Sequence, residues 1–242
     1  SCDKDAYIVI EEYNEALQLI YKNAVEIGKY EIIKREKAIE LCDDNTLVIE
    51  IGCGAGALTK IIKTKTKNYL GYEIDKKLEP ILSTIDKNII YDDFLKRDIK
   101  KDIEKYSFEE IYLIANLPYY ITTPIINKII EENLNIQKLI IMVQKEVGDR
   151  FLAKPNSKSY GSLTIFINYY FNVSKLFNVS RNVFVPRPNV DSVVLKFEKK
   201  NELKGLKNKE LFFKIVKESF NQRRKKLLNN LKNYNTNKII EI

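Results

Sequence analysis

The 242-residue sequence contains no histidine and no tryptophan, and it has three cysteines and one methionine. Without an imidazole, a histidine-dependent nucleophilic triad, a histidine-ligated metal and an imidazole general base are excluded. The cysteines, Cys2, Cys42 and Cys53, lack paired spacing, which argues against a zinc site and indicates a reducing compartment. We therefore expect no metal, and a chemistry that works without a strong general base.

Long apolar runs are also missing. No stretch reaches the roughly 18 uncharged apolar residues of a membrane span, and the mixed, acidic N-terminus is unlike a secretory signal. With 45% hydrophobic and 31% charged residues, the composition predicts a soluble globular protein. We expect a cytoplasmic location, with a eukaryotic nucleus or organelle as the alternative.

The charge is distributed unevenly along the chain. Residues 199–242 carry 13 Lys and Arg against 4 Asp and Glu, so the excess behind the net charge of +8 lies in this tail. Four of these cations are consecutive, and we expect them to share one turn of a helical tail that begins near Asn208: Arg223, Arg224, Lys225 and Lys226. A basic tail on a neutral body indicates a polyanion-binding appendage. A solvated basic helix face is the alternative.

Short apolar segments alternate with helical ones after an N-terminal stretch, about 11–41, that has helical spacing. Strands are expected over residues 46–51, 68–74, 87–91, 111–115, 138–143, 163–171 and 192–197. This alternation predicts an α/β fold with a doubly wound sheet. We expect a catalytic domain over residues 1–198 and a small basic helical domain over 199–242.

Candidate binding residues follow the first two expected strands. Gly52, Gly54 and Gly56 form a loop between strand and helix, where glycine permits a tight turn and close approach of a ligand. Glu50 and the third glycine favour S-adenosylmethionine, although the loop also fits a loose dinucleotide fingerprint. Glu73 ends the second strand, where a carboxylate can accept hydrogen bonds from ribose hydroxyls. These residues indicate a nucleoside cofactor.

Three further aspartates lie near strand ends. Asp93 follows the third strand and is placed to accept a hydrogen bond from an adenine amino group, although Asp92 could exchange roles with it. Asp75 fits a helix N-cap better than a ligand site.

The segment Asn116–Tyr119, of sequence NLPY, follows the fourth strand and decides between the cofactors. An exocyclic adenine amine is a poor nucleophile, because its lone pair is delocalised into the ring. The side-chain oxygen of Asn116 and the carbonyl of Leu117 can accept its two N–H bonds and favour a tetrahedral nitrogen, while Pro118 stiffens the turn. Tyr119 can stack on an extruded base. The expected reaction is methyl transfer to N6 of adenine in RNA.

From about Val48 to Leu228 the chain resembles the KsgA-type rRNA adenine N6,N6-dimethyltransferases. The matching segments, in order, are IEIGCGAGALT, YEID, DDFL, NLPYYITTPII, VQKEVGDRFLAKPNSKSYGSLT, VFVPRPNVDSVVLKF and SFNQRRKKLLNNL. The resemblance implies a Rossmann-like class I methyltransferase fold with a small C-terminal helical domain and S-adenosylmethionine as cofactor. It also implies dimethylation of two adjacent adenosines near the 3′ end of small-subunit rRNA.

Individual roles follow from the same resemblance. Gly52, Glu73, Asp93 and Asn116 would contact the cofactor or target base, and Phe184 would flank the adenine together with Tyr119. The basic cluster, residues 223–226, would contact rRNA phosphates. The implied partner is small-subunit rRNA in a pre-ribosomal particle, bound by a monomer, without a membrane.

Two departures from the family pattern stand out. The glutamine-asparagine-phenylalanine-leucine segment that closes over the cofactor should precede Gly52 by about 25 residues, but residues 25–28 read VEIG. The helical domain is expected to be shortened. Alternatives are a large-subunit rRNA methyltransferase, which typically has Ile where Leu117 stands, a non-catalytic assembly or transcription factor, and a NAD-dependent oxidoreductase.

Overall fold

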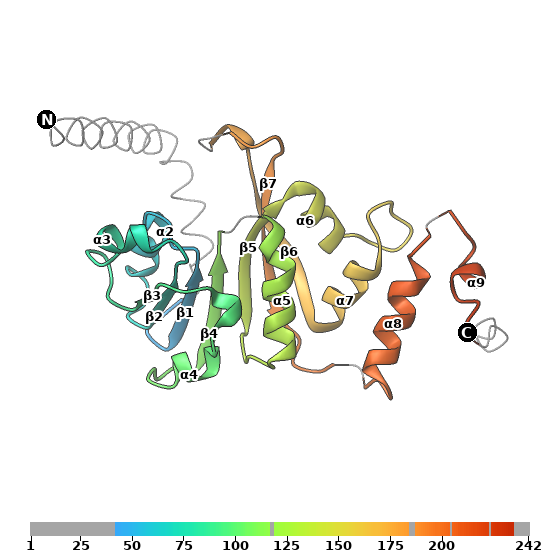
Figure 1. The fold of residues 1–242 in the computed structure, drawn as a ribbon, viewed down its shortest axis with the longest axis horizontal. Coiled ribbons are helices and arrows are strands. Elements are labelled where there is room, and N and C mark those ends of the chain that lie inside the picture. Colours follow the sequence, from blue (N-terminus) through green and yellow to red (C-terminus); the bar gives the residue numbers. More distant parts are fainter. Residues whose placement is uncertain (1–41, 117–118, 184–186, 204, 223, 235–242) are drawn as a thin grey trace, which may run out of the picture.

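The computed structural model describes residues 42–116, 119–183, 187–203, 205–222 and 224–234. Within this part of the chain, seven strands form one sheet (Figure 1): β1 (Thr46–Ile51), β2 (Tyr69–Tyr72), β3 (Ile89–Ile90), β4 (Glu110–Ala115), β5 (Lys138–Gln144), β6 (Phe171–Val179) and β7 (Ser192–Lys199). The helices are α2 (Ala57–Ile62), α3 (Glu79–Leu82), α4 (Ile99–Ile103), α5 (Thr122–Glu131), α6 (Lys145–Phe151), α7 (Ser162–Tyr170), α8 (Lys209–Ser219) and α9 (Leu227–Asn230). The helices expected over 11–41 lie outside the described residues.

The strand order is β3-β2-β1-β4-β5-β7-β6. Strands β1 to β5 run parallel to one another, and β7 runs antiparallel to both β5 and β6. The order reverses between β1 and β4, and ligands in open α/β sheets bind beyond the carboxyl ends of the strands at such a point. The predicted Rossmann-like α/β class is confirmed.

The two faces of the sheet carry different helices. In β1, Leu47, Ile49 and Ile51 belong to a core cluster with side chains from α4, α5, α6 and α7. Val48 belongs to the cluster on the other face, to which α2 contributes Ile62 and α3 contributes Leu82. This alternation is the two-residue period of a strand buried on both sides.

The strand expected over residues 163–171 is wrong. Helix α7 occupies 162–170, and β6 begins at Phe171. The segment has no charged residue, and Thr164 and Asn168 interrupt an otherwise apolar or aromatic run, because α7 is covered on two sides. Ile167 faces the sheet core, while Phe166 and Tyr169 pack their rings against Phe213 of α8. A helix covered twice shows no polar stripe, so its sequence resembles a buried strand.

The tail is helical where expected, since α8 begins after the N-cap Asn208, whose side chain accepts from the Leu211 amide. The expectation that residues 223–226 share one helical turn is wrong for 224–226, which form the turn between α8 and α9. Arg223 lies outside the described residues. The side chain of Asn230 holds this turn by donating to the carbonyls of Ser219 and Gln222. In a continuous helix, positions 223 and 226 would also lie on the same face, where like charges repel one another.

Candidate functional site

The glycine loop after β1 adopts backbone conformations that require glycine. Gly52, Gly54 and Gly56 have φ of 76°, 55° and 78°, in the left-handed region that L side chains rarely adopt. A Cβ on Gly54 would meet no atom within 4 Å, whereas one on Gly56 would lie 2.3 Å from Ile85 Cδ1. Gly54 therefore borders open space, and Gly56 allows the turn to pack on the helical segment behind it.

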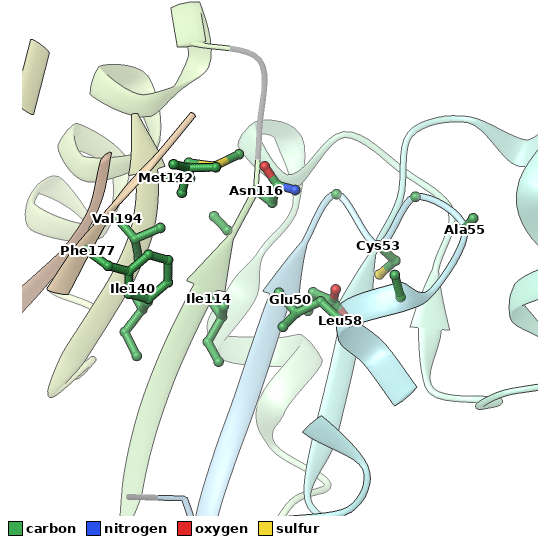
Figure 2. Close-up of a pocket in the computed structure, with 15 residues that line it drawn as sticks. Glu50, Cys53, Ala55, Leu58, Ile114, Asn116, Ile140, Met142, Phe177 and Val194 are labelled. Atoms are coloured by element: carbon green, nitrogen blue, oxygen red, sulfur yellow. The ribbon is translucent and has the colours of Figure 1, made fainter. Parts of the chain in front are cut away.

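A cavity of about 260 Å³ lies beside this loop (Figure 2). It is lined by Glu50, Gly52, Cys53, Gly54, Ala55, Ala57, Leu58, Ile114, Ala115, Asn116, Ile140, Met142, Phe177, Val179 and Val194. We refer to it as the cofactor cavity. It brings together four of the predicted site residues: Glu50, Gly52, Gly54 and Asn116.

Strand pairing places Asn116 at the mouth of this cavity. Ile51 pairs with Ala115 in the parallel register of β1 and β4, so the next residues, Gly52 and Asn116, leave the sheet side by side. Asn116 is exposed, and Figure 2 shows its amide at the end of β4 beside the glycine loop. A side chain with both a carbonyl and an amide group thus borders the cavity at the switch point of the sheet.

The opposite wall is apolar and comes from the antiparallel end of the sheet. Ile140 and Met142 of β5, Phe177 of β6 and Val194 of β7 form it (Figure 2). The residue spacing in the sequence gave no sign of this wall, because the β5–β7 and β6–β7 registers bring together positions far apart in the chain.

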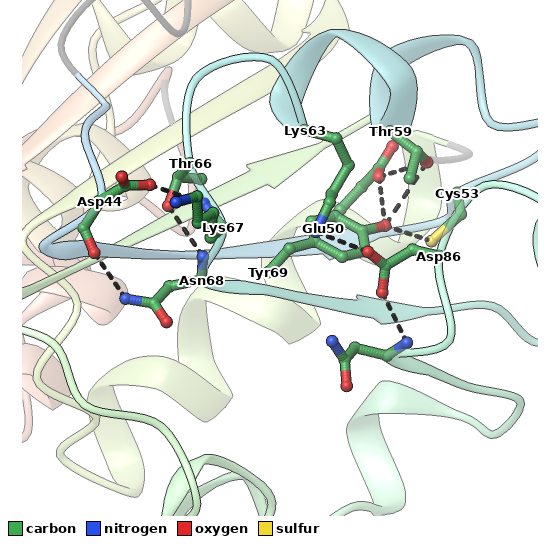
Figure 3. Close-up of polar contacts among 11 residues, drawn as sticks. Asp44, Glu50, Cys53, Thr59, Lys63, Thr66, Lys67, Asn68, Tyr69 and Asp86 are labelled. Atoms are coloured by element: carbon green, nitrogen blue, oxygen red, sulfur yellow. Dashed lines mark hydrogen bonds and ion pairs between the residues drawn. The ribbon is translucent and has the colours of Figure 1, made fainter.

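Glu50 is buried below the glycine loop, with 1% of its surface exposed. Its Oε2 accepts hydrogen bonds from the Tyr69 hydroxyl at 2.6 Å and from Thr59 Oγ1 at 2.7 Å (Figure 3). Burial raises the pKa of Glu50 to about 7, although the hydrogen bonds from Tyr69 and Thr59 oppose the increase. Sequence reasoning missed Tyr69 and Thr59, since a tyrosine in a strand and a threonine in a helix carry no distinctive signal.

Cys53 lies in the same network, 3.4 Å from the Tyr69 hydroxyl. Burial and the neighbouring Glu50 carboxylate raise the pKa of its thiol to about 12. The thiolate is the reactive form of cysteine, so the protonated Cys53 thiol serves in packing and hydrogen bonding rather than as a nucleophile.

Glu73 contacts the glycine loop directly. Its Oε2 accepts from the Gly54 amide at 2.8 Å and its Oε1 accepts from the Asp75 amide at 2.9 Å. Asp75 is the N-cap of η1 (Lys76–Leu78), as predicted, and its side chain accepts from the Lys77 amide. Glu73 thus fixes the loop, and each carboxylate oxygen keeps a further lone pair for a ligand.

Asp93 is not among the residues that line the cofactor cavity. It follows β3 as the N-cap of η2 (Phe94–Lys96), where its Oδ1 accepts from the Leu95 amide at 3.0 Å. Asp93 follows the edge strand β3, two strands away from β1 and its glycine loop. Its contact with the adenine of a cofactor therefore stays a prediction.

Several predicted residues lie outside the described part of the chain: Leu117, Pro118, Phe184, Arg223 and the segment 25–28. The backbone of Tyr119 begins η3 (Tyr119–Ile121), and its side chain is not described. Arg224, Lys225 and Lys226 are exposed and do not line the cofactor cavity.

Within the described ranges, no group of three or more Cys, Asp or Glu side chains is arranged to hold a metal ion. Over the same residues, no helix combines the length and apolar character needed to cross a membrane.

The cofactor cavity suits a molecule with a polar, nucleoside-like part and an aliphatic part, because the glycine loop, Glu50 and Asn116 face an apolar wall. A strand order of 3-2-1-4-5-7-6 with this loop after β1 and an asparagine after β4 defines a Rossmann-like, S-adenosylmethionine-dependent methyltransferase. The family model for ribosomal RNA adenine dimethylase matches residues 30–242, and the chain belongs to that family.

Curated relatives agree with this assignment. A protein named ribosomal RNA small subunit methyltransferase A, from Aster yellows witches'-broom phytoplasma, is 51% identical over 189 residues, covering 76% of this chain and 70% of the relative. The protein of the same name from Bacillus pumilus is 46% identical over 198 residues, covering 78% and 68%.

Solved structures show the same fold. A dimethyladenosine transferase from Plasmodium falciparum superimposes with a TM-score of 0.68 and 29% identity, covering 84% of this chain and 72% of that one. The 23S rRNA methyltransferase ErmE gives a TM-score of 0.64 at 23% identity, covering 88% and 85%.

Proposed function

We propose that the protein transfers methyl groups to N6 of two adjacent adenosines in small-subunit rRNA, with dimethyladenosine as the product. The observation that carries the proposal is the β1–β4 register, which sets Asn116 beside Gly52 at the mouth of the cofactor cavity. S-adenosylmethionine supplies the methyl group when it is bound. Family membership supports the reaction, and the two curated relatives named for the small subunit support that substrate over the large subunit.

Asn116 activates the amine in this proposal. Its side-chain oxygen accepts one N–H bond of the adenine amino group, and the carbonyl of Leu117 accepts the other. The nitrogen lone pair is then withdrawn from the ring and directed at the methyl group. Because these two oxygen acceptors are already in position, they stabilise the positive charge that develops on the nitrogen, and the protein does not have to reorganise during the reaction.

The proton released from N6 needs no strong base. The methylated nitrogen is cationic and acidic, so it can lose its proton to water, which reaches the site because Asn116 is exposed. This agrees with a chain that has no histidine. Tyr119 and Phe184 would hold the extruded adenine between their rings, since an enzyme that modifies a base must take it out of the stack.

Glu50, Gly52, Gly54, Glu73 and Asp93 would hold the cofactor. The glycine loop permits close approach of its backbone, and open space over Gly54 supports this role. The Glu73 carboxylate, fixed against the loop, would accept from ribose hydroxyls, and Asp93 from the adenine amine.

The tail would hold the rRNA. Residues 199–242 form a small basic helical domain in this proposal, which follows the end of the last strand at Lys199 and docks on α7 through Phe213 of α8 (Figure 1). Arg223, Arg224, Lys225 and Lys226 would contact phosphates. The protein would act as a cytoplasmic monomer on a pre-ribosomal particle, in line with its bacterial relatives.

The test is methyl transfer from labelled S-adenosylmethionine to purified unmethylated small subunits, with matched large subunits as the control. Nucleoside mass spectrometry should find dimethyladenosine in small-subunit rRNA alone. Transfer to the large subunit, or monomethyladenosine as the final product at saturating cofactor, would refute the proposed substrate or product.

A further inference from the structure

A second cavity, of about 470 Å³, lies between two segments that are distant in the sequence. One is the loop that joins α6 to α7, and the other is the turn that joins α8 to α9 (Figure 1). The lining residues are Ser157, Lys158, Tyr160, Ser219, Phe220, Gln222, Lys225 and Leu227. We call it the loop–tail cavity. It shares no lining residue with the cofactor cavity.

Hydrogen bonds fix the loop side of this cavity. The Ser157 amide donates to the Lys154 carbonyl, and the Tyr160 amide donates to the Ser157 carbonyl, both at 3.2 Å. Asn156, inside the first of these turns, has a φ of 69°, a left-handed conformation that asparagine tolerates in turns. Two consecutive turns therefore present Ser157 and Lys158 on an ordered, exposed ridge.

The tail side is fixed in the same way. Asn230 Nδ2 donates to the Ser219 carbonyl at 2.9 Å and to the Gln222 carbonyl at 3.3 Å. The Lys225 amide donates to the Gln222 carbonyl at 2.9 Å. The rings of Tyr160 and Phe220 then join the two sides, with centroids 6.0 Å apart in an edge-to-face contact. The cavity is thus formed by tertiary structure from two braced segments.

The lining chemistry is that of an anion site with an apolar floor. Lys158 and Lys225 supply cations, Ser157 supplies a hydroxyl and Gln222 an amide, and among the described residues no aspartate or glutamate lines the cavity. Tyr160 adds an aromatic ring with a hydroxyl. Protein contacts to nucleic-acid phosphate and sugar come from these same groups. The volume lies within the range of small-ligand pockets, about 300–1,000 Å³.

We propose that the loop–tail cavity binds one nucleotide of the rRNA substrate, outside the site where adenine is methylated, and that Lys158 and Lys225 hold its phosphate. The inference rests on the proposed function, because it takes rRNA as the partner. It assigns an RNA-binding role to the loop between α6 and α7, and it explains why the basic turn after α8 is held against that loop rather than continued as helix.

The experiment compares Lys158→Gln with Lys154→Gln. Both lysines are exposed on the same loop, and Lys154 does not line the loop–tail cavity, so both variants lose one charge but only the first removes a cavity cation. Binding to unmethylated small subunits is measured from 50 to 200 mM salt. Each phosphate contact contributes about 0.7–0.9 to the slope of log affinity against log salt. The slope should flatten by that amount in K158Q and remain at the wild-type value in K154Q.

When salt is raised from 50 to 200 mM, the fold-loss of rRNA affinity should be about three times larger for the wild type than for K158Q. Methyl transfer at saturating subunits should keep its kcat in both variants, and KM should rise in K158Q alone. Unfolding temperatures should match the wild type, because both side chains are on the surface.

Equal slopes for K158Q and K154Q, whether both flatten or neither does, would overturn the proposal. That result would be distinct from failure of the proposed function, which would appear as absence of methyl transfer by the wild type. A binding partner other than RNA would also leave both slopes at the wild-type value, and so counts against the proposal.

Discussion

Replacing Glu50 by glutamine should remove a pH-dependent loss of stability that the wild type carries between about pH 4.5 and pH 7. Burial raises the pKa of this carboxyl from 4.5 to about 7 in the folded protein. A group with a raised folded pKa binds more protons in the folded than in the unfolded state, so the free energy of unfolding falls as pH rises through this window. At about 1.36 kcal/mol for each pKa unit, the loss is about 3 kcal/mol.

The glutamine variant keeps the size and the side-chain carbonyl, which can still accept from Tyr69 and Thr59. It has no ionisable group at this position, so its free energy of unfolding should not show the decrease that Glu50 causes between about pH 4.5 and pH 7. Urea denaturation of both proteins at pH 4.5, 5.5, 6.5 and 7.5 gives the difference in unfolding free energy at each pH, in which the other titrating groups cancel. That difference should shift by about 3 kcal/mol in favour of the variant and level off above pH 7.

Tyr69→Phe provides a matched control, because it removes the hydrogen bond that lowers the pKa of Glu50 while the ring remains. The pH window should then extend upward. Saturating S-adenosylmethionine should act in the opposite direction, since a sulfonium cation in the cofactor cavity favours the ionised carboxylate. A difference between wild type and E50Q that stays constant across this pH range would refute the reasoning.

Three further outcomes are expected. Asn116→Ala should lower the rate of methyl transfer by roughly 100- to 1000-fold, by analogy with the loss of one donor from an oxyanion hole. Calorimetry should find the affinity for S-adenosylmethionine within a few-fold of wild type. A variant as active as the wild type would contradict the role of Asn116 in activating N6. S-adenosylmethionine should raise the unfolding temperature by mass action and NAD should leave it unchanged, so the reverse pattern in a thermal-shift series would exclude the assigned cofactor. Replacing Arg223 and Arg224 together by glutamine should flatten the slope of log rRNA affinity against log salt by about one to two. If filter binding finds the slope unaltered, the basic cluster is a solvated surface rather than an RNA contact.

Local signals in the sequence sufficed for the part of the sheet that carries the site. Strands 46–51 and 111–115 were expected within one residue of β1 and β4, and the glycines after β1 adopt the conformations that their residue type permits. Each of these signals lies within a few residues of chain, where backbone sterics and hydrophobic pattern decide the outcome. Asp75 as an N-cap and Asn208 as the start of the tail helix were predictable for the same reason.

Tertiary structure decided what depends on distant neighbours. Residues 163–171 were misread as a strand because α7 is buried between the sheet and α8, and double burial removes the periodicity that distinguishes a helix. The pKa of Glu50 and its bonds to Tyr69 and Thr59 depend on packing among three separate elements.

The sequence by itself determined the class of fold, the family and the edge of the sheet at which chemistry occurs, because those rest on short motifs and on alternation along the chain. Only the tertiary structure decided that β5, β6 and β7 complete the cofactor cavity with an apolar wall, and that the basic turn after α8 meets the loop before α7. The physical reason is that strand register and helix docking are set by the burial of whole faces, which no single segment of the sequence contains.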